Sequence, residues 1–360
     1  MLAFAAYSAF IVLLFLGSRF LPGIHVEGQP LRDGARLPYK LSGMLLFIVV
    51  SALAAAAELL GFRLARVLDH FWPLFWSANV WAVLFTAYLM VRGWRRHPPA
   101  GLWDRLKSVW LGAELNPRFA SVDLKMFMYH PSLIGLHVVN LAFASQQLER
   151  YGTITAEMFL YQCFTSAYLF THYLREDFML STWDIIAERF GFMLVWGDLV
   201  YVTFYYSIVG WWVVDRGWTG SDDAAVHEPL STAALVAIVV LHVLSHVLFR
   251  GSNWQKDRFK RNPAAPIWGK PPDLVGGRLL ASGWWGIGRK LNYTGEIGVY
   301  VTFALCAGLA SWVPYVLPFS LVLLLVQRAW RDEQRCKKKY GELWDAYCAR
   351  ARFRMVPFLY

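Results

Sequence analysis

The chain has 360 residues, of which 57% are hydrophobic and only 17% charged, and its formal net charge is +10. This composition excludes a set of ordinary soluble domains and favours one polytopic membrane body. The positive charge does not indicate nucleic-acid binding. The cations lie in the loops between apolar runs, as the positive-inside rule predicts for a membrane protein.

Apolar runs of roughly the twenty residues needed to cross a bilayer recur before the polar tail. They lie near residues 2–17, 40–62, 72–91, 131–148, 154–174, 190–214 and 231–249. Two further spans fit between 296 and 327 as a hairpin broken at Pro314 and Pro318. The sequence therefore predicts an all-α, polytopic integral membrane protein with nine transmembrane helices, or ten if residues 278–289 also enter the membrane.

The loops after the third and seventh runs carry clustered arginine and lysine, so we expect both to face the cytoplasm. With alternating helices, the C-terminal tail then faces the same side. Between the third and fourth runs, residues 93–130 form a surface connection, and residues 102–111 are expected to be a short interfacial helix. We read the chain as one multi-pass unit, in a bacterial inner membrane or, in a eukaryote, the endoplasmic reticulum.

Two polar regions interrupt the apolar pattern. Residues 175–188 include Glu176, and the sixth run contains Asp198 followed by Tyr201 and Tyr205. A carboxylate well inside a membrane helix costs ~3 kcal/mol on insertion scales and usually faces a cavity or a partner. Asp198 is thus a candidate site residue, and the alternative is an ion pair or a tyrosine hydrogen bond that locks two helices together. Glu176 is near the cytoplasmic end, where solvation or capping is an equal alternative.

A second candidate site lies in the last third of the chain. Lys256 and Lys260 are four residues apart and share one helical face below the seventh run. Two ammonium groups on one face attract a multiply charged anion, although anchoring to anionic lipid gives the same pattern. Arg328 and Asp332 in the tail add a rigid cation and an acceptor for ribose hydroxyls. The block from Gly283 to Gly286 adds flat aromatic rings. Such rings could stack on a base of the ligand, but an interfacial aromatic belt would have the same residues.

His242 and His246 have an i, i+4 spacing that could ligate one metal ion. The other histidines are scattered, so packing or hydrogen bonding between helices is the favoured interpretation. The four cysteines show no CxxC spacing, and no metal is expected.

Taken together, short motifs in the order of the chain resemble the sterol reductases, the family that includes the sterol C14, C7 and C24(28) reductases and the membrane part of the lamin B receptor. The similar blocks cover roughly residues 111–360. They are Leu115-Asn116-Pro117-Arg118 with Asp123 to Phe127, Phe190 to Leu194 with Gly197-Asp198-Leu199, Asn253-x-Gln255-Lys256-x-x-Phe259, Ser282 to Gly286, Asn292-Tyr293-x-Gly295, and Arg331-Asp332-Glu333-x-Arg335-Cys336 through Lys339-Tyr340-Gly341, Trp344 and Tyr347.

The resemblance implies NADPH-dependent reduction of a sterol carbon–carbon double bond, with a cofactor pocket on the cytoplasmic side of the C-terminal half. It implies that residues 1–130 form N-terminal helices and a cytoplasmic loop, 131–249 the sterol pocket, and 250–360 the NADPH-binding part. The implied cofactor contacts are Lys256, Lys260, Leu280, Trp285, Asn292, Arg328, Asp332 and Tyr340. Lys260 departs from the arginine that is usual in the family, which keeps the charge but loses the bidentate fork.

The reduced bond could be ring Δ14 or Δ7, or side-chain Δ24 or Δ24(28). Ring-reducing members carry Trp-Asn-Glu where this chain has Leu174-Arg175-Glu176, yet Gly197-Asp198 resembles the ring reductases. An isolated alkene accepts hydride only when one carbon becomes cationic, so a proton donor must lie beside the bond. As a hypothesis, Asp198 or Glu176 supplies the proton, with Tyr201 or Tyr205 relaying it.

Two other readings compete. A membrane methyltransferase of the isoprenylcysteine type also holds a nucleotide-like cofactor at a C-terminal hairpin, but its S-adenosyl donor has no phosphate to attract the lysines. A non-enzymatic sterol-binding protein is the other alternative. The expected partners are a membrane sterol and the bilayer, with no nucleic acid and no obligate protein partner.

Overall fold

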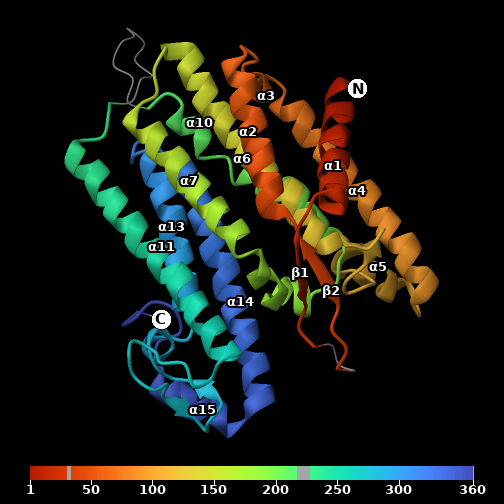
Figure 1. Ribbon diagram of the computed structural model, residues 1–360, viewed down its shortest axis with the longest axis vertical. Helices are drawn as coiled ribbons and strands as arrows, with labels where there is room; N and C mark the ends of the chain where they lie inside the picture. Colours follow the sequence, from red (N-terminus) through yellow and green to blue (C-terminus); the bar gives the residue numbers. More distant parts are fainter. Residues whose placement is uncertain (31–33, 217–227, 360) are drawn as a thin grey trace. The chain divides into compact units, whose positions relative to one another are not determined.

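The computed structural model describes residues 1–30, 34–216 and 228–359 and is mostly helical (Figure 1). Its contacts divide the chain into two compact units, Met1–Asp215 and Arg216–Tyr360, which we call unit 1 and unit 2. The expected organisation as a single membrane domain, with parts that meet near residues 130 and 249, stays a prediction.

Unit 1 consists mainly of long apolar helices. Its elements are α1 (Leu2–Phe20), β1 (Ile24–Glu27), β2 (Pro38–Leu41), α2 (Gly43–Leu59), α3 (Arg66–Asp69), α4 (Phe71–Arg96), α5 (Leu102–Leu111), β3 (Arg118–Phe119), β4 (Val122–Asp123), α6 (Leu124–Tyr151), α7 (Ala156–Leu174), the 3₁₀ helix η1 (Glu176–Ser181), α8 (Trp183–Ile186), α9 (Phe192–Trp196), the π-helix η2 (Gly197–Tyr205) and α10 (Gly210–Val213).

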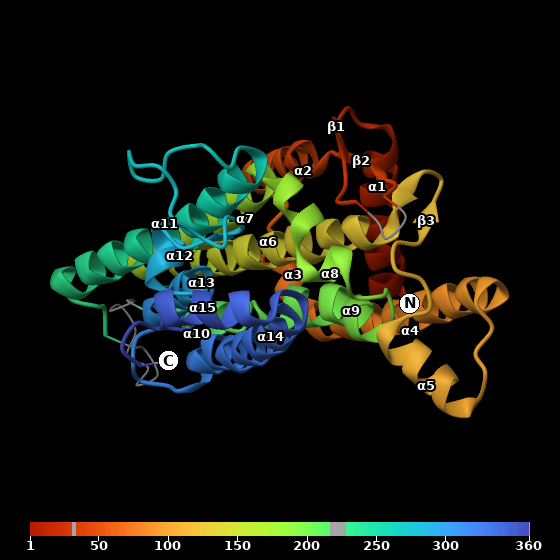
Figure 2. The same cartoon turned by 90° about the horizontal axis from the view of Figure 1, so that it is seen from below.

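The long helix α6 forms the centre of unit 1. It is buried along most of its length and packs against α1, α2, α7 and η2 (Figure 2). Its start is fixed locally, because the Asp123 carboxylate accepts hydrogen bonds from the backbone N–H groups of Lys125 and Met126 at 3.1 and 3.0 Å. Such an N-cap satisfies donors that a helix end leaves open. This capped helix carries the polar residues Lys125 and His130 into the core.

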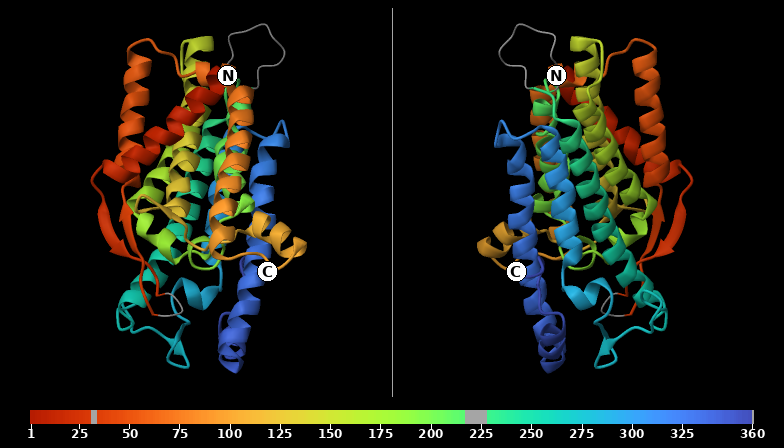
Figure 3. Two further views of the ribbon diagram at one scale, coloured as in Figure 1. Left: turned by 90° about the vertical axis from the view of Figure 1, so that its right-hand side faces the viewer. Right: turned by 90° about the vertical axis from the view of Figure 1, so that its left-hand side faces the viewer.

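The described part of unit 2 contains three long helices and a polar C-terminal tail. Its elements are α11 (Thr232–Arg261), β5 (Leu274–Val275), β6 (Leu279–Leu280), α12 (Trp284–Ile287), α13 (Leu291–Cys306), the 3₁₀ helix η3 (Val313–Tyr315), α14 (Val316–Tyr340) and α15 (Glu342–Arg350). Helix α13 packs against both α11 and α14, and Figure 3 shows α14 continuing far along the unit toward α15. His242 joins α11 to α13 through a 2.8 Å hydrogen bond to Thr302, the interhelical role expected for it.

Each apolar run of the sequence is mainly helical, and residues 102–111 form α5 as expected. Among the described residues, five helical stretches are long and apolar enough to cross a membrane: Leu2–Phe20, Phe71–Arg96, Phe192–Val213, Thr232–Arg261 and Val313–Tyr340. Residues 278–289 form only a short strand and the four-residue α12, which is too short for a span. The nine spans expected from the sequence stay a prediction.

Candidate functional site

The centre of the candidate site in unit 2 is the pair Lys256 and Trp285. Lys256 lies near the C-terminal end of α11, and its ammonium is 4.1 Å from the centroid of the Trp285 ring. The indole N–H of Trp285 donates to the Ser252 carbonyl at 2.9 Å, which fixes the ring. A cation held on an aromatic face gains about 0.5–2 kcal/mol, depending on desolvation.

The turn before Trp285 depends on a glycine. Gly283 has a φ of 61°, in the left-handed region that favours glycine, and an added Cβ would come within 2.3 Å of the Gln255 side chain. The Gln255 side-chain oxygen accepts the backbone N–H of Trp284 at 2.9 Å. The sequence block around Gly283 thus positions Trp285 against α11.

A second cation, Lys290, lies beside this pair. It is buried, and its ammonium forms an ion pair with Asp332 of α14. Burial opposes the charged form, yet the Asp332 carboxylate holds the pKa of Lys290 above its ordinary value. Lys256 interacts electrostatically with Lys290, Lys260 and Asp332. We call Lys256, Lys260, Trp285, Lys290 and Asp332 the cationic cluster.

The amide of Asn292 has an open acceptor. Its nitrogen donates to the Asn253 side-chain oxygen at 3.2 Å. Its oxygen is buried and has no hydrogen-bond partner in the part of the chain that the structure describes. The next residue, Tyr293, interacts electrostatically with Lys290, Arg328 and Asp332, which places Arg328 at the same site.

The remaining expected contacts differ in their placement. Leu280 is buried against Ile267 and Trp285, so it belongs to the site. Lys260 is exposed, one helical turn beyond Lys256. Tyr340 packs in a neighbouring cluster around Trp344 and Tyr347. The assignment of all eight side chains to a cofactor stays a prediction.

Sequence reasoning missed Lys290 and its neighbour Arg289. Arg289 donates from Nε to the Glu333 carboxylate at 3.0 Å and from Nη1 to the Ala351 carbonyl at 2.7 Å. Arg354 also pairs with Glu333, at 2.7 Å. This network fixes the C-terminal segment against α14. Both cations were visible in the polar stretch before Asn292, but nothing in the sequence identified their partners.

The donor set of the cationic cluster fits a phosphate-bearing ligand. Lys256 and Lys290 act on the Asp332 carboxylate, and Asp257 acts on Lys260, so the three lysines outnumber the two carboxylates. The open Asn292 oxygen can accept a hydrogen bond from an amide or a hydroxyl. A ligand with phosphates, ribose hydroxyls and an amide would satisfy both features.

In unit 1, Asp198 is buried on the π-helix η2, with only 8% of its surface exposed. No hydrogen bond reaches its carboxylate from the residues described, although Lys125 and Asp184 act on it electrostatically. π-helical segments are rare and occur frequently at functional sites. A buried acid of this kind needs either a ligand or a chemical role.

Both carboxylate oxygens of Glu176, unlike those of Asp198, have partners among the described residues. One carboxylate oxygen lies 3.0 Å from His130 Nε2, and the other accepts the backbone N–H of Gly43 at 3.0 Å. His130 in turn contacts the Ser18 hydroxyl at 2.8 Å through Nδ1. Glu176 therefore ties α2, α6 and η1 together, the capping alternative that the sequence left open.

Lys125 explains part of the charge near Asp198. Its ammonium donates to the backbone carbonyls of Asp184, Glu188 and Ile185 at 2.5, 2.7 and 3.3 Å. Burial lowers the pKa of Lys125 to about 8. These bonds hold the short helix α8 and the loop after it against α6.

Tyr201 and Tyr205 lie on the same π-helix as Asp198. Their rings stack with centroids 4.8 Å apart and an interplanar angle of 13°, and Trp196 stacks on Tyr201 at 6.0 Å. The three rings form a continuous aromatic stack along η2. A relay role for either hydroxyl stays a prediction.

Comparisons with known proteins give a consistent result. A family model described as the ergosterol biosynthesis ERG4/ERG24 family matches residues 1–360. A Delta(14)-sterol reductase of Arabidopsis thaliana is 37% identical over 358 residues, covering 98% of this chain and 94% of that protein. One from Methylotuvimicrobium alcaliphilum is 36% identical over 361 residues, covering 96% and 81%. A 7-dehydrocholesterol reductase of Xenopus laevis is 30% identical over 392 residues, covering 100% and 79%.

Proposed function

Because this chain belongs to the ergosterol biosynthesis ERG4/ERG24 family, we propose that it is an enzyme that reduces a carbon–carbon double bond of a membrane sterol with NADPH. The observation that carries the choice of cofactor is the cationic cluster, where lysines exceed carboxylates beside an open amide oxygen. Among the double bonds considered, Δ14 is the first to test. Relatives named Delta(14)-sterol reductase reach 37% identity, against 30% for a 7-dehydrocholesterol reductase.

The residues of the cationic cluster would contact different parts of such a cofactor. NADPH would supply the hydride. Lys256 and Lys260 would neutralise its phosphates, and the surplus of cations favours a dinucleotide with an extra ribose phosphate. Asp332, held by Lys290, keeps a carboxylate oriented to accept hydroxyl donors. Asn292 offers its open oxygen to a donor of the ligand.

The proton that complements the hydride would come from Asp198. A carboxyl group without hydrogen-bond partners in a buried setting favours its neutral form, which can donate a proton. Protonation of one alkene carbon leaves the other cationic, and hydride then completes the saturated bond. Glu176 is the weaker candidate because both its oxygens are already bound, and Tyr201 or Tyr205 would serve as a relay to Asp198.

The proposal also places the enzyme in its membrane. Nine spans with basic cytoplasmic loops would put the end of α11, with Lys256, on the cytoplasmic side, where NADPH is found. The central helices between 131 and 249 would receive the sterol from the bilayer. The enzyme would thus take NADPH from water and the sterol from lipid.

The test is incubation of the purified full-length protein with NADPH and, separately, with Δ14, Δ7, Δ24 and Δ24(28) sterols. Mass spectrometry should show a product two mass units heavier, and one deuterium in it when the NADPH is labelled at the transferred position. We expect the Δ14 sterol to react fastest. Absence of reduced product from all four sterols, with a correctly folded protein, would refute the proposal.

A further inference from the structure

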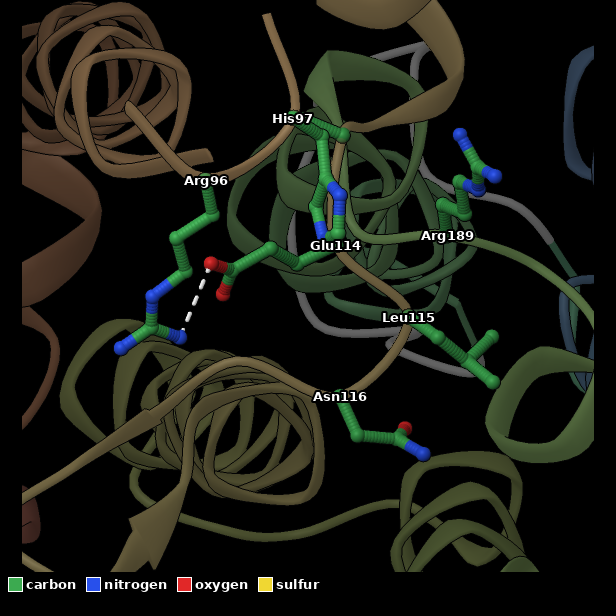
Figure 4. A pocket seen from close by; sticks show the side chains of 7 residues that line it. Arg96, His97, Glu114, Leu115, Asn116 and Arg189 are labelled. Carbon is green, nitrogen blue, oxygen red and sulfur yellow. Dashed lines mark hydrogen bonds and ion pairs between the residues drawn. The ribbon is translucent and has the colours of Figure 1, made fainter. Parts of the chain in front are cut away.

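A pocket in unit 1 lies apart from the residues proposed for catalysis. It has a volume of about 450 Å³ and is lined by the end of α4, the segment before β3, and the residue before Phe190. The lining side chains are those of Arg96, His97, Ala113, Glu114, Leu115, Asn116 and Arg189. We call this the loop pocket (Figure 4). Its size is within the range of small-molecule sites.

The walls of the loop pocket are held by a close approach of two backbone segments. Gly112 has a φ of 101°, and a Cβ added at Gly191 would come within 2.2 Å of the Gly112 nitrogen. The backbone N–H of Phe190 donates to the Glu114 carbonyl at 2.9 Å. Two chain segments that are far apart in sequence therefore meet here in a fixed arrangement. The fold itself thus forms the wall of the pocket.

The charge of the loop pocket is positive. Glu114 is paired with both Arg92, at 3.2 Å, and Arg96, at 3.1 Å, so two guanidinium groups face one carboxylate. Arg189 forms no ion pair within the described ranges of the chain, and Figure 4 shows it on the side of the Glu114 segment opposite Arg96. The Asn116 side-chain oxygen is buried without a hydrogen-bond partner among the residues that the structure covers. The pocket thus offers uncompensated cations and an acceptor for a hydroxyl donor.

The position of the loop pocket favours a lipid as its ligand. Arg96 is the last residue of α4, one of the helices able to cross a membrane, so the pocket is at the end of that stretch. Beside it, α5 exposes Trp103, Leu106 and Trp110, at 77%, 54% and 54% of their surfaces. Their spacing of three and four residues places them on one helical face. A 2.9 Å hydrogen bond from Trp94 to Ser108 fixes α5 beside α4.

Tryptophan-rich helices with cations nearby are typical of proteins that lie in the membrane interface. We propose that the loop pocket binds the phosphate of an anionic phospholipid, with Arg189 as its main ligand, while α5 lies among the lipid chains. The Asn116 oxygen accepts a headgroup hydroxyl. The site is independent of the proposed reduction and of the cationic cluster in unit 2.

The experiment measures binding of a soluble short-chain phosphatidylglycerol to the full-length protein in a neutral detergent. Inorganic phosphate and the corresponding short-chain phosphatidylcholine serve as separate ligands. We expect Arg189→Gln and His97→Gln each to weaken binding of phosphatidylglycerol, the former about tenfold, because it removes a charge-assisted hydrogen bond. Arg95→Gln is the matched control: it removes the same charge next to the pocket, and should change the affinity less than twofold.

Unfolding temperatures of the variants, unchanged for these exposed residues, would confirm that each protein is folded. The proposal is overturned if Arg95→Gln weakens binding as much as Arg189→Gln, since the general positive electrostatic potential of the region would then explain the binding. It is also overturned if phosphatidylglycerol does not bind, if phosphatidylcholine binds equally, or if inorganic phosphate alone binds as tightly as the lipid.

Discussion

The polar core of unit 1 and the cationic cluster of unit 2 differ in how completely their members satisfy one another. In unit 1, Lys125 donates to three carbonyls, and Glu176 has a partner at each oxygen. In the cationic cluster, lysines exceed carboxylates, and the Asn292 oxygen is open. Buried groups with full sets of partners stabilise the fold, whereas incomplete sets point to a ligand. Asp198 is a buried carboxylate of unit 1 to which no described residue donates a hydrogen bond, and for that reason we assign it a chemical role.

The replacement Asp198→Asn tests that chemical role and should have the largest effect. Asparagine keeps the size of the side chain but cannot donate a proton to carbon, so turnover of the Δ14 sterol should fall by at least about a hundredfold. NADPH affinity should be unchanged, because unit 2 carries the proposed cofactor contacts. The measurement is product formation by mass spectrometry beside a binding titration. Asp69→Asn, on an exposed carboxylate of the same unit, is the control, and equal turnover in both variants would rule out Asp198 as the donor.

If the hydrogen-bonded polar groups of unit 1 have a structural role, removing one of their donors should lower the stability of the protein. Lys125→Met leaves three backbone carbonyls without their donor, so the free energy of unfolding should fall by about 3 kcal/mol. Denaturant unfolding in detergent would measure it. The exposed replacement Lys107→Met should stay within about 0.5 kcal/mol of the original protein. If both variants are equally stable, the bonds of Lys125 contribute little to the fold.

The helices could be predicted from the sequence, but not every feature of the fold. Long apolar runs identified the helices because a helix that crosses a bilayer needs about twenty apolar residues. Lys256 and Lys260 were placed correctly on one helix because α11 runs to Arg261 without a break. The π-helix at Asp198 was not foreseen, since an inserted residue in the hydrogen-bond ladder leaves no mark in hydrophobic periodicity.

The partners of polar residues were the main omission. Glu176 was identified as a candidate acid, but His130 lies 46 positions before it, and no local pattern joins the two. Lys290 and Asp332 are likewise 42 positions apart. Such pairs depend on how helices pack, so the sequence could name the charged residues but not decide which of them neutralise each other. Knowing which charged residues neutralise each other is what distinguishes structural groups from those of the candidate site.

The smallest expected effect concerns Lys260, where the family resemblance implies an arginine. Lys260→Arg adds a bidentate fork at an exposed position, so NADPH affinity should rise about threefold. Lys260→Gln should lower it by a similar factor. Titration of the cofactor against each purified variant would measure both changes. An unchanged affinity in both variants would remove Lys260 from the site while leaving Lys256 in place.

The most direct test of the cofactor assignment is an equilibrium titration of the full-length protein with NADPH and with S-adenosylmethionine, repeated for Lys256→Gln and for the exposed control Lys270→Gln. We predict that the original protein and Lys270→Gln bind NADPH equally. Lys256→Gln should bind it about tenfold more weakly, and none of the three should bind S-adenosylmethionine measurably. Binding of S-adenosylmethionine in preference to NADPH, or equal NADPH affinity in all three proteins, would contradict the assignment.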